Sequence, residues 1–348
     1  MNILSLFDGI GCGRVALERA GIKVDSYYAS EIEKSAITIA KSNYSDIIEI
    51  GDVTKVSYED NILYTENGNF NIKHINFVIG GSPCTDFSSM GYANGMKSGQ
   101  TEILSLSQYL ILKKSGVKFD GQSYLFWEYV RILREVKPDY FLLENVIMAK
   151  KWQKIIDETI GIRPIQINSS LLSAQNRPRL YWTNIKNIEI PTDKNILLED
   201  ILDKKAPKND VSHCQTVQKS FAKLVSKYGY IPLKFNAYNI KEIKDKACAL
   251  SRGSMVTSSC ATLILVECTD GVHSVNDGIM DGKYPVKLKD GYYNLRKLNF
   301  REMERLQTLP DDYTAVEGVS TQKRSSAIGN CWTVDVITHI LSYIKENA

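Results

Sequence analysis

A single cysteine follows a tight turn in the segment GGSPCTDFSSMG, which occupies residues 80–91. The apolar run HINFVI before it predicts a short buried strand, and glycine and proline directly after a strand predict a rigid turn. Cys84 at the mouth of this turn is compatible with two roles, a small buried apolar residue or a nucleophile. The other polar residues of the chain show which of these two roles is favoured.

Two further groups of polar residues accompany predicted strands. Glu144 lies at the end of the apolar run DYFLLEN, where a carboxyl group can stay protonated and donate a hydrogen bond. Arg177 and Arg179 flank a proline in QNRPRLYW, and alternate residues of an extended segment point the same way. Two arginines are also compatible with a solvated face or a structural ion pair. Cysteine, protonatable glutamate and paired arginines together are a residue set for nucleophilic catalysis.

A glycine-rich turn, LFDGIGCGRVALERAG, joins the first predicted strand to the first predicted helix. Its glycines let the backbone approach a ligand closely, but no phosphate-binding lysine follows them. The turn therefore suits a nucleoside cofactor without phosphates, and it is also compatible with a plain tight turn. Glu31 ends the second predicted strand and Asp52 the third. An acid after the second strand binds ribose hydroxyls in folds of this kind.

Strand-like and helix-like segments alternate along the first half of the chain. The predicted strands are 2–7, 24–30, 47–52, 76–81 and 139–145, and the predicted helices are 15–21, 33–43 and 123–138. This alternation predicts an α/β fold with a doubly wound parallel sheet and helices on both faces. Ligands of such sheets bind beyond the carboxyl ends of the strands, where Cys84, Glu144, Glu31 and Asp52 all fall.

The pattern changes at about residue 183. Short strand-like runs appear (CATLILVEC, KYPVKLKDG, YYNLRKL) and lysines are dense between Lys186 and Lys246. The segments NFREMERLQTLP and TVDVITHILSYIK then predict two helices. We therefore expect a first domain made of residues 1–182 and 296–348, and a smaller, mostly β and irregular domain made of residues 183–295.

The bulk composition sets limits on the class of protein. The 348 residues are 43% hydrophobic and 24% charged, as in an ordinary globular protein. We expect no membrane span and no signal peptide, because no apolar run is long enough and no basic region precedes the first one. Seven scattered cysteines without a CxxC pair favour a reducing compartment over a zinc or disulfide framework. The net charge of +3 permits a nucleic-acid partner if the basic residues cluster.

The motifs occur in a characteristic order along essentially the whole chain. They are LFDGIGCGR, SEIEKSAITIAKSNY, GDVTKV, GGSPCTDFS, ENV, QNRPRLYW, REMERLQTLPDDYT and GNCWTVDVI. In these segments the chain resembles the DNA (cytosine-5) methyltransferases, which have a Rossmann-like catalytic domain. The last motif, GNCWTV, departs from the usual GNAV. Its tryptophan resembles the de novo branch of the animal enzymes and related phage and bacterial chains.

The resemblance implies covalent catalysis on a cytosine in double-stranded DNA. Cys84 would attack carbon 6 as a thiolate, and carbon 5 would accept the methyl group. Glu144 would hold ring nitrogen 3 and the exocyclic amine, Arg179 would contact the carbonyl oxygen, and Arg177 would support the site. The implied catalytic set is Cys84, Glu144, Arg179, Arg177, Pro83 and Asn145.

The implied cofactor is S-adenosyl-L-methionine, with S-adenosyl-L-homocysteine as its product and no metal. Glu31 would bind the ribose hydroxyls and Asp52 the adenine amine, while Ile32 and Val53 would enclose the adenine ring. The implied cofactor-binding set is Phe7, Asp8, Gly9, Gly11, Glu31, Ile32, Asp52, Val53, Gly80, Asn330 and Trp332.

DNA contacts are implied in two segments. Ser88 lies in the stretch after Cys84 that matches a mobile loop closing over a flipped base. Arg252 and Ser254 lie in KACALSRGSMVTSSCATL, inside the domain 183–295 that occupies the place of the target-recognition domain. The segment 101–121 is longer than in the shortest members of the family, and the resemblance implies no role for it.

Three alternatives stay open to test. The transfer-RNA methylating branch usually carries a Cys-Phe-Thr stretch, which this chain lacks. A non-catalytic DNA-binding homologue would lose Cys84 or the cofactor acids. Methylation of an exocyclic amine would need a Pro-Pro-aromatic run in place of SPCT. We expect a bacterial or phage-borne enzyme in the cytoplasm, associated with the nucleoid. The target sequence, a cognate restriction endonuclease, and a monomeric or dimeric state are left open.

Overall fold

The computed structural model describes residues 1–84, 87, 96–203, 215–237, 239–250, 262–267 and 293–344. The chain divides into two compact units. Unit 1 consists of Met1–Asn168, Pro178–Pro191 and Val334–Ala348, and unit 2 of Ser169–Arg177 and Thr192–Thr333.

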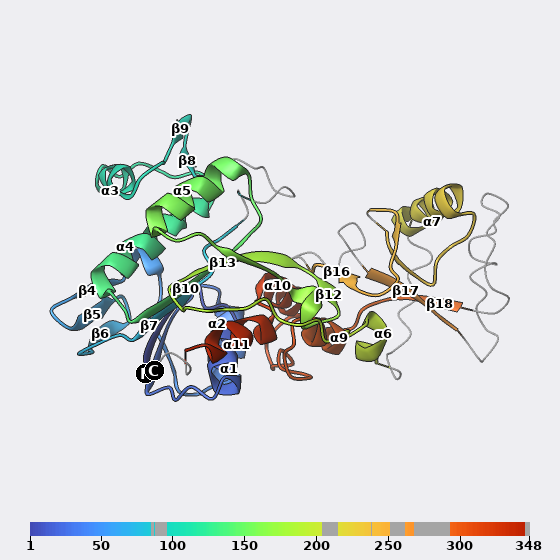
Figure 1. Cartoon of the computed structure of the whole chain (residues 1–348), viewed down its shortest axis with the longest axis horizontal. Helices are drawn as coiled ribbons and strands as arrows, with labels where there is room; N and C mark the ends of the chain where they lie inside the picture. Colours follow the sequence, from blue (N-terminus) through green and yellow to red (C-terminus); the bar gives the residue numbers. More distant parts are fainter. Residues whose placement is uncertain are drawn as a thin grey trace. The chain divides into compact units, whose positions relative to one another are not determined.

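A seven-stranded sheet forms the centre of unit 1 (Figure 1). Its order is β11 (Ile165–Asn168), β13 (Pro178–Thr183), β10 (Tyr140–Val146), β7 (Phe77–Gly80), β1 (Asn2–Leu6), β2 (Ser26–Ser30) and β3 (Ile47–Glu49). The pairs from β10 to β3 are parallel, as the alternation predicts, whereas β13 pairs antiparallel with both β10 and β11. The fold class is therefore confirmed, with one reversed strand that the alternation does not predict.

Helices cover both faces of this sheet (Figure 1). On one face lie α1 (Cys12–Arg19), α2 (Lys34–Asn43) and α11 (Val334–Ser342), and on the other α4 (Phe126–Val136) and α5 (Lys150–Ile160). Phe126, Tyr129 and Val130 recur at helical spacing on α4, and they pack with Leu4 and Val78 of the sheet into one buried cluster. This packing fixes the sheet edge on which the predicted site lies.

Shorter elements of unit 1 connect the strands and helices of the central sheet along the chain. The hairpin sheet contains β4 (Ser57–Glu59), β5 (Ile62–Thr65) and β6 (Gly68–Asn71). The 3-10 turns η1 (Val53–Lys55) and η2 (Ser123–Leu125) precede β4 and α4. The strand pair β8 (Lys97–Ser98) and β9 (Thr101–Glu102) leads into α3 (Leu106–Lys114), which lies within the segment 101–121.

Unit 2 contains short strands and helices around its own buried cluster. A four-stranded sheet has the order β15 (Lys241–Glu242), β14 (Lys234–Asn236), β17 (Thr262–Glu267) and β18 (Tyr293–Lys297), and β12 (Gln175–Asn176) pairs with β16 (Ala247–Cys248). The remaining elements are η3 (Ser169–Leu171), α6 (Leu198–Ile201), α7 (Gln215–Tyr228), α9 (Phe300–Leu306) and α10 (Thr321–Asn330). The runs CATLILVEC and YYNLRKL thus contain strands, while KYPVKLKDG lies outside the described residues.

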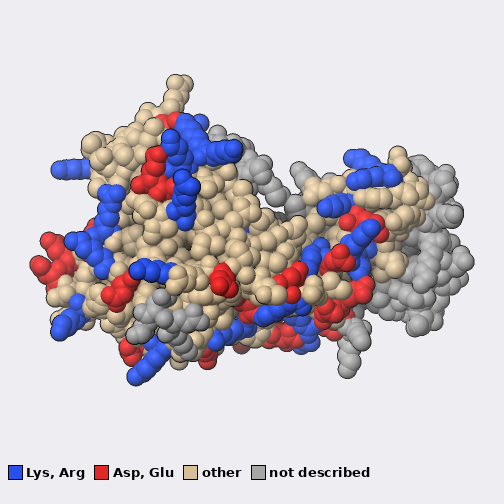
Figure 2. Space-filling model, viewed as in Figure 1, with Lys and Arg blue, Asp and Glu red and all other residues tan. Residues whose placement is uncertain are grey.

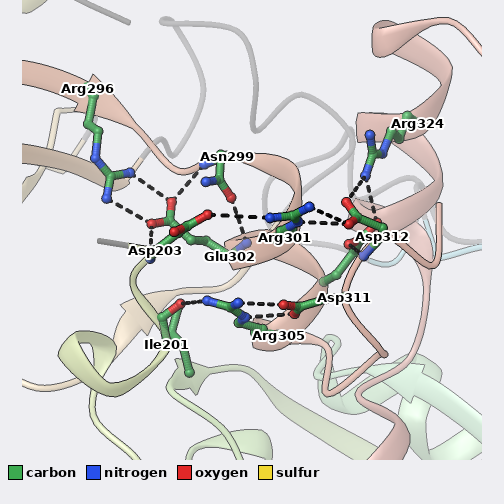
Figure 3. A network of polar contacts seen from close by, with 11 residues as sticks. Ile201, Asp203, Arg296, Asn299, Arg301, Glu302, Arg305, Asp311, Asp312 and Arg324 are labelled. Atoms are coloured by element: carbon green, nitrogen blue, oxygen red, sulfur yellow. Dashed lines mark hydrogen bonds and ion pairs between the residues drawn. The ribbon is translucent and has the colours of Figure 1, made fainter. Parts of the chain in front are cut away.

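Ion pairs surround the first turns of α9 (Figure 3). The helix begins with a capping box, in which Asn299 and Glu302 each accept a backbone N–H of the other. Arg296 donates two hydrogen bonds of 2.8 Å to the buried carboxylate of Glu302. Arg305 donates to Asp311 and to the carbonyl oxygen of Ile201. The hydrogen bonds between Glu302 and Arg296 offset part of the cost of burying both charges.

Within the part of the chain that the structure describes, no helix is both long enough and apolar enough to cross a membrane.

Candidate active site

The strand register places several predicted site residues at one edge of the sheet in unit 1. Leu6 on β1 is level with Ser30 on β2 and with Gly80 on β7, and Gly80 is level with Leu143 on β10. The next residues along these parallel strands therefore leave the sheet on the same side. They include Phe7, Glu31 and Glu144, and the turn that leads to Cys84 begins at the same level.

The turn before Cys84 is held from two sides. The side-chain amide of Asn145 donates to the carbonyl and hydroxyl oxygens of Ser82, at 3.1 Å each. The hydroxyl of Ser123 donates to the carbonyl oxygen of Pro83 at 3.2 Å. Asn145 and Ser123 are both buried, so these bonds are shielded from water. The backbone that carries Cys84 is fixed, and the Cys84 side chain itself is partly exposed.

Gly80 has no room for a side chain where β7 ends. A Cβ atom at this position would lie 2.8 Å from the carbonyl oxygen of Leu6 and 3.1 Å from the ring of Tyr129. Glycine therefore permits the close approach of β7 to β1 at the point where the turn to Cys84 starts.

Glu144 and Arg179 form an ion pair on adjacent strands. The Nε atom of Arg179 lies 3.0 Å from Oε1 of Glu144, and each side chain is mostly buried. Arg179 is opposite Val146 in the antiparallel register, so its side chain reaches along β10 to Glu144. A second nitrogen of the same guanidinium, Nη1, donates to the carbonyl oxygen of Pro178 at 2.9 Å, so Arg179 is held from two sides.

Arg177 has different partners from Arg179, although the two are neighbours in the motif. Its guanidinium is 4% exposed and donates to the carbonyl oxygens of Leu250, Gly329 and Cys331, at distances between 2.7 and 3.2 Å. All of these residues belong to unit 2. The two arginines therefore have separate partners, and Arg177 lies between the end of β12 and the start of β13.

The glycine turn after β1 brings a buried acid to the sheet edge. Oδ1 of Asp8 accepts hydrogen bonds from the hydroxyl groups of Ser5 and Tyr27, at 2.6 Å each. Oδ2 of Asp8 is buried and has no partner among the described residues. Burial raises the pKa of Asp8 to about 6. An unpartnered polar atom at this edge fits a ligand that can form a hydrogen bond or carry a positive charge.

Glu31 is oriented by the backbone around it. Its Oε2 accepts from the N–H of Gly9 at 2.9 Å, and its Oε1 accepts from the N–H groups of Ile32 and Glu33. Gly9 has a φ of +64°, and the space beside it is open. Ile32 is 67% exposed, which is high for an isoleucine. Turn, carboxylate and exposed apolar side chain together fit a ribose and a flat base.

Asp52 caps the turn η1. Its Oδ1 accepts from the backbone N–H of Thr54 at 2.9 Å, and Val53 beside it is buried. The carbonyl oxygen of Gly51 accepts from the hydroxyl of Ser30, which ties this loop to the end of β2. Asp52 and Glu31 therefore follow neighbouring strands of the same sheet, as the sequence predicts.

The remaining predicted residues are Gly11 in unit 1, Asn330 and Trp332 in unit 2, and three residues outside the described part of the chain. Asn330 is exposed at the end of α10, and Trp332 follows it at the end of unit 2. Gly11 lies in the glycine turn as the N-cap residue of α1. The three DNA-contact residues, Ser88, Arg252 and Ser254, lie outside the described residues.

Sequence reasoning missed a basic helix end beside the Cys84 turn. The ring of Trp152 on α5 lies 6.2 Å from the ring of Phe87, three residues after Cys84. The same helix carries Lys150, Lys151 and Lys154, which are exposed. Figure 2 shows Lys and Arg side chains gathered over this part of unit 1. The signal in the sequence was KKWQK directly after the strand that carries Glu144.

A doubly wound sheet with a glycine turn after β1 and an acid after β2 is typical of Rossmann-like folds that bind a nucleoside group. The family model described as C-5 cytosine-specific DNA methylase matches residues 1–346. The chain belongs to this family.

Curated phage proteins match part of the chain. The orphan methyltransferase M.SPBetaI of Bacillus phage SPbeta is 30% identical over 214 residues, which are 53% of this chain and 45% of that protein. The orphan methyltransferase M.Rho11sI of Bacillus phage rho11s is 27% identical over 207 residues, 56% of this chain and 35% of that protein. The chain spans less than half the length of either relative.

Solved structures match the whole chain. The methyltransferase EhMeth of Entamoeba histolytica has a TM-score of 0.65 at 14% identity and covers 100% of this chain and 98% of its own. The Dnmt2 methyltransferase of S. pombe has a TM-score of 0.60 at 16% identity, with 100% and 99% covered. At these identities the likeness establishes the fold.

Proposed function

We propose that this protein transfers a methyl group from S-adenosyl-L-methionine to carbon 5 of cytosine in double-stranded DNA, with Cys84 as the nucleophile. One observation carries the proposal. The braced turn before Cys84 leaves the sheet at the level where β10 reaches the Glu144–Arg179 ion pair. A nucleophile and a hydrogen-bonding pair at one edge are what addition to a polar ring requires.

Unit 1 offers a set of groups that fits the cofactor. Glu31 would bind the ribose hydroxyls, Ile32 and Val53 would enclose the adenine, and Asp52 would accept from its amine. The unpartnered Oδ2 of Asp8 fits the charged amino-acid end, and Phe7, Gly9, Gly11 and Gly80 shape the turns around it. When bound, S-adenosyl-L-methionine supplies an electrophilic methyl group for carbon 5.

Cys84 makes carbon 5 reactive in this proposal. Its thiolate forms a bond to carbon 6, and the electron pair of the 5,6 double bond moves onto carbon 5. After methylation, a base removes the proton from carbon 5. The released electron pair restores the double bond, the bond between carbon 6 and sulfur breaks, and the Cys84 thiolate is regenerated.

Glu144 and Arg179 would hold the base during this sequence. Glu144 faces ring nitrogen 3 and the exocyclic amine, and Arg179 donates to the carbonyl oxygen of the ring. The charge that develops on the ring after attack by Cys84 is then matched by a fixed cation and a hydrogen-bonding acid. Arg177 would act at a distance, because its donors are used on the backbone of the GNCW motif.

DNA binding is proposed for two regions. The exposed lysines of α5 would contact phosphates beside the flipped base, and the domain 183–295 would supply the contacts that choose the target sequence. Ser88, Arg252 and Ser254 are the proposed DNA contacts. The phage and Bacillus relatives support a role in a bacterial or phage-infected cell, alone or beside a restriction endonuclease.

A methylation assay on a random-sequence DNA library tests the function. The purified chain is incubated with the cofactor, and 5-methylcytosine is then located at base resolution. Methylation within one short motif is the expected result and would also supply the specificity. Transfer-RNA is assayed in parallel. Methylation of RNA alone, or of neither substrate by a chain that binds cofactor, would contradict the proposal.

A further inference from the structure

The segment 101–121 packs directly on the loop proposed to bind adenine. Its base is closed, because β8 pairs with β9 and Lys97 forms a bridge with Asp120. Ser105 caps α3 by accepting from the N–H of Gln108. The segment is therefore a folded part of unit 1 whose two ends are held together.

Aromatic side chains join this segment to the start of α4. Tyr109 on α3 is buried and lies 5.2 Å from Phe119, measured between ring centroids. Phe119 stacks on Tyr124 of η2 at 4.4 Å. Burial raises the pKa of Tyr124, and the nearby negative charge of Asp52 raises it further. The aromatic group thus connects α3 to η2 at the start of α4.

A buried carboxylate connects α3 to α4. Glu128 on α4 is fully buried and accepts hydrogen bonds from the hydroxyl of Tyr109 and the ammonium of Lys113. Arg131 donates to the same carboxylate, with its Nε at 2.8 Å. A buried carboxylate with three donors fixes the positions of all of them.

Lys113 and Arg131 then reach the turn η1. The Nζ atom of Lys113 donates to the carbonyl oxygen of Thr54 at 2.9 Å, and Nη2 of Arg131 donates to the carbonyl oxygen of Val56 at 2.6 Å. The last carbonyl groups of a helical turn have no partner within it, so these cations satisfy them. Lys113 thereby holds the residue that follows Val53.

Glu66 holds the same loop from another element, the turn between β5 and β6. Its Oε1 accepts from the backbone N–H of Asp52 at 2.8 Å, and its Oε2 lies 2.9 Å from Nζ of Lys55. A Cβ atom on Gly51 would lie 2.3 Å from this carboxylate, so only glycine lets Glu66 approach. Residues 51–56 are therefore held between Glu66 and Lys113.

We propose that Lys113 and Glu66 are positioning residues that set the selectivity of the cofactor pocket for an adenine base. Neither side chain needs to touch the base, because each binds the backbone on which Asp52 and Val53 stand. The role of the segment 101–121 in this proposal is to place Lys113 within hydrogen-bonding distance of that backbone. The inference rests on the proposed function, since it assumes that Asp52 accepts from the adenine amine.

The test compares two ligands that differ only in the base. S-adenosyl-L-homocysteine has the amine that Asp52 would accept from, whereas S-inosyl-L-homocysteine has a carbonyl oxygen there, which Asp52 would repel. Calorimetry on the full chain gives the ratio of their affinities. We expect Lys113→Met to lower this ratio about fivefold or more, because a shift of the loop weakens the adenine ligand more than the inosine ligand.

Lys114 provides a matched control. It is exposed, and it lines the same surface hollow of about 620 Å³ as Lys113. Lys114→Met removes the same charge from the same hollow and should keep the wild-type ratio. Glu66→Ala removes the acceptor of the backbone N–H of Asp52 and leaves the contacts of Glu128 in place. It should lower the affinity ratio as Lys113→Met does. This variant keeps the proposal testable if Lys113→Met does not fold.

The outcomes separate this inference from the proposed function. A lowered ratio in the two loop variants but not in Lys114→Met supports the inference. A wild-type ratio in folded Lys113→Met or in Glu66→Ala overturns it, even if thermal stability falls, because a merely structural role lowers stability without changing the ratio. A wild-type chain that binds neither ligand would overturn the proposed function itself.

Discussion

The guanidinium of Arg179 lies 3.0 Å from the carboxylate of Glu144, across the antiparallel pair that β13 forms with β10. The two side chains should therefore act as a unit on the base. We expect Glu144→Gln and Arg179→Met each to lower kcat by a factor of roughly 10² to 10⁴. The double variant should lose little more than the worse single variant.

Steady-state kinetics on methylatable DNA would measure this coupling. Lys73→Met, at an exposed position before the start of β7 and away from the proposed DNA contacts, is a suitable control for general effects on stability. Losses that add fully in the double variant would show that Glu144 and Arg179 work independently, contrary to the paired role.

Cys84→Ser should abolish methyl transfer while the chain still binds the cofactor. The side chain is partly exposed and small, so the thermal midpoint should change little. Cys248→Ala, a partly exposed cysteine in unit 2, should stay active. DNA with 5-fluorocytosine offers a direct readout. Fluorine replaces the proton that must be removed from carbon 5, so the bond between carbon 6 and Cys84 cannot break and the adduct is visible on a denaturing gel. Adduct formation by Cys84→Ser would rule out this nucleophile.

Arg177 and Arg179 should differ in their effect on folding. Arg177→Met leaves three buried carbonyl oxygens without their donor, and we expect it to lower the free energy of unfolding by about 2–4 kcal/mol. Arg179→Met leaves the mostly buried carboxylate of Glu144 without its partner, so it should also destabilise the fold, and adding Glu144→Gln should recover part of the loss. Glu144→Gln should not recover the loss caused by Arg177→Met. Urea denaturation of the single and double variants measures the difference. Recovery in both double variants, or in neither, would contradict the separate roles.

The chain without cofactor should lose stability as the pH rises from about 4 to 7. Burial raises the pKa of Asp8 to about 6 from its ordinary 3.8, and burial together with Asp8 and Glu31 raises that of Glu49 to about 7 from 4.5. The folded state then binds more protons than the unfolded state in this window, so the free energy of unfolding falls as pH increases. Asp8 alone accounts for at most about 3 kcal/mol.

Glu49→Gln isolates one contribution to this pH dependence. Both carboxyl oxygens of Glu49 are buried without a partner among the described residues, so the amide removes a titration without removing a hydrogen bond. Denaturation between pH 5 and 8 should show a shallower decline than in the wild type. Glu59→Gln, at an exposed position, should leave the decline unchanged. A stability that is flat with pH in the wild type would contradict the expectation.

The sheet edge that carries the candidate site could be predicted from the sequence because it depends on short-range patterns. The strands of the parallel part can be recognised in the sequence, and an acid follows each of three strands within three residues: Asp8 after β1, Glu31 after β2 and Asp52 after β3. Parallel pairing then places these ends together without further information. The family and fold expected from the motifs are confirmed, and the individual site roles stay predictions.

The supports of the edge could not be predicted in this way. Lys113 and Thr54 are 59 positions apart, and Glu66 lies on an exposed hairpin turn that no apolar pattern singles out. Their contacts depend on how the segment 101–121 docks on α4. The different partners of Arg177 and Arg179 likewise depend on where one strand stops and the next begins, which a motif does not encode.

Helix α11 packs on α1, and Asp335 on α11 forms an ion pair of 2.7 Å with Arg19. The last helix of the chain therefore covers a sheet whose first strand begins at residue 2. During synthesis, the surface of α1 that α11 covers stays exposed until unit 2 and then α11 have been made. We expect a chain that stops before α11 to leave exposed the apolar surface of α1 that this helix covers.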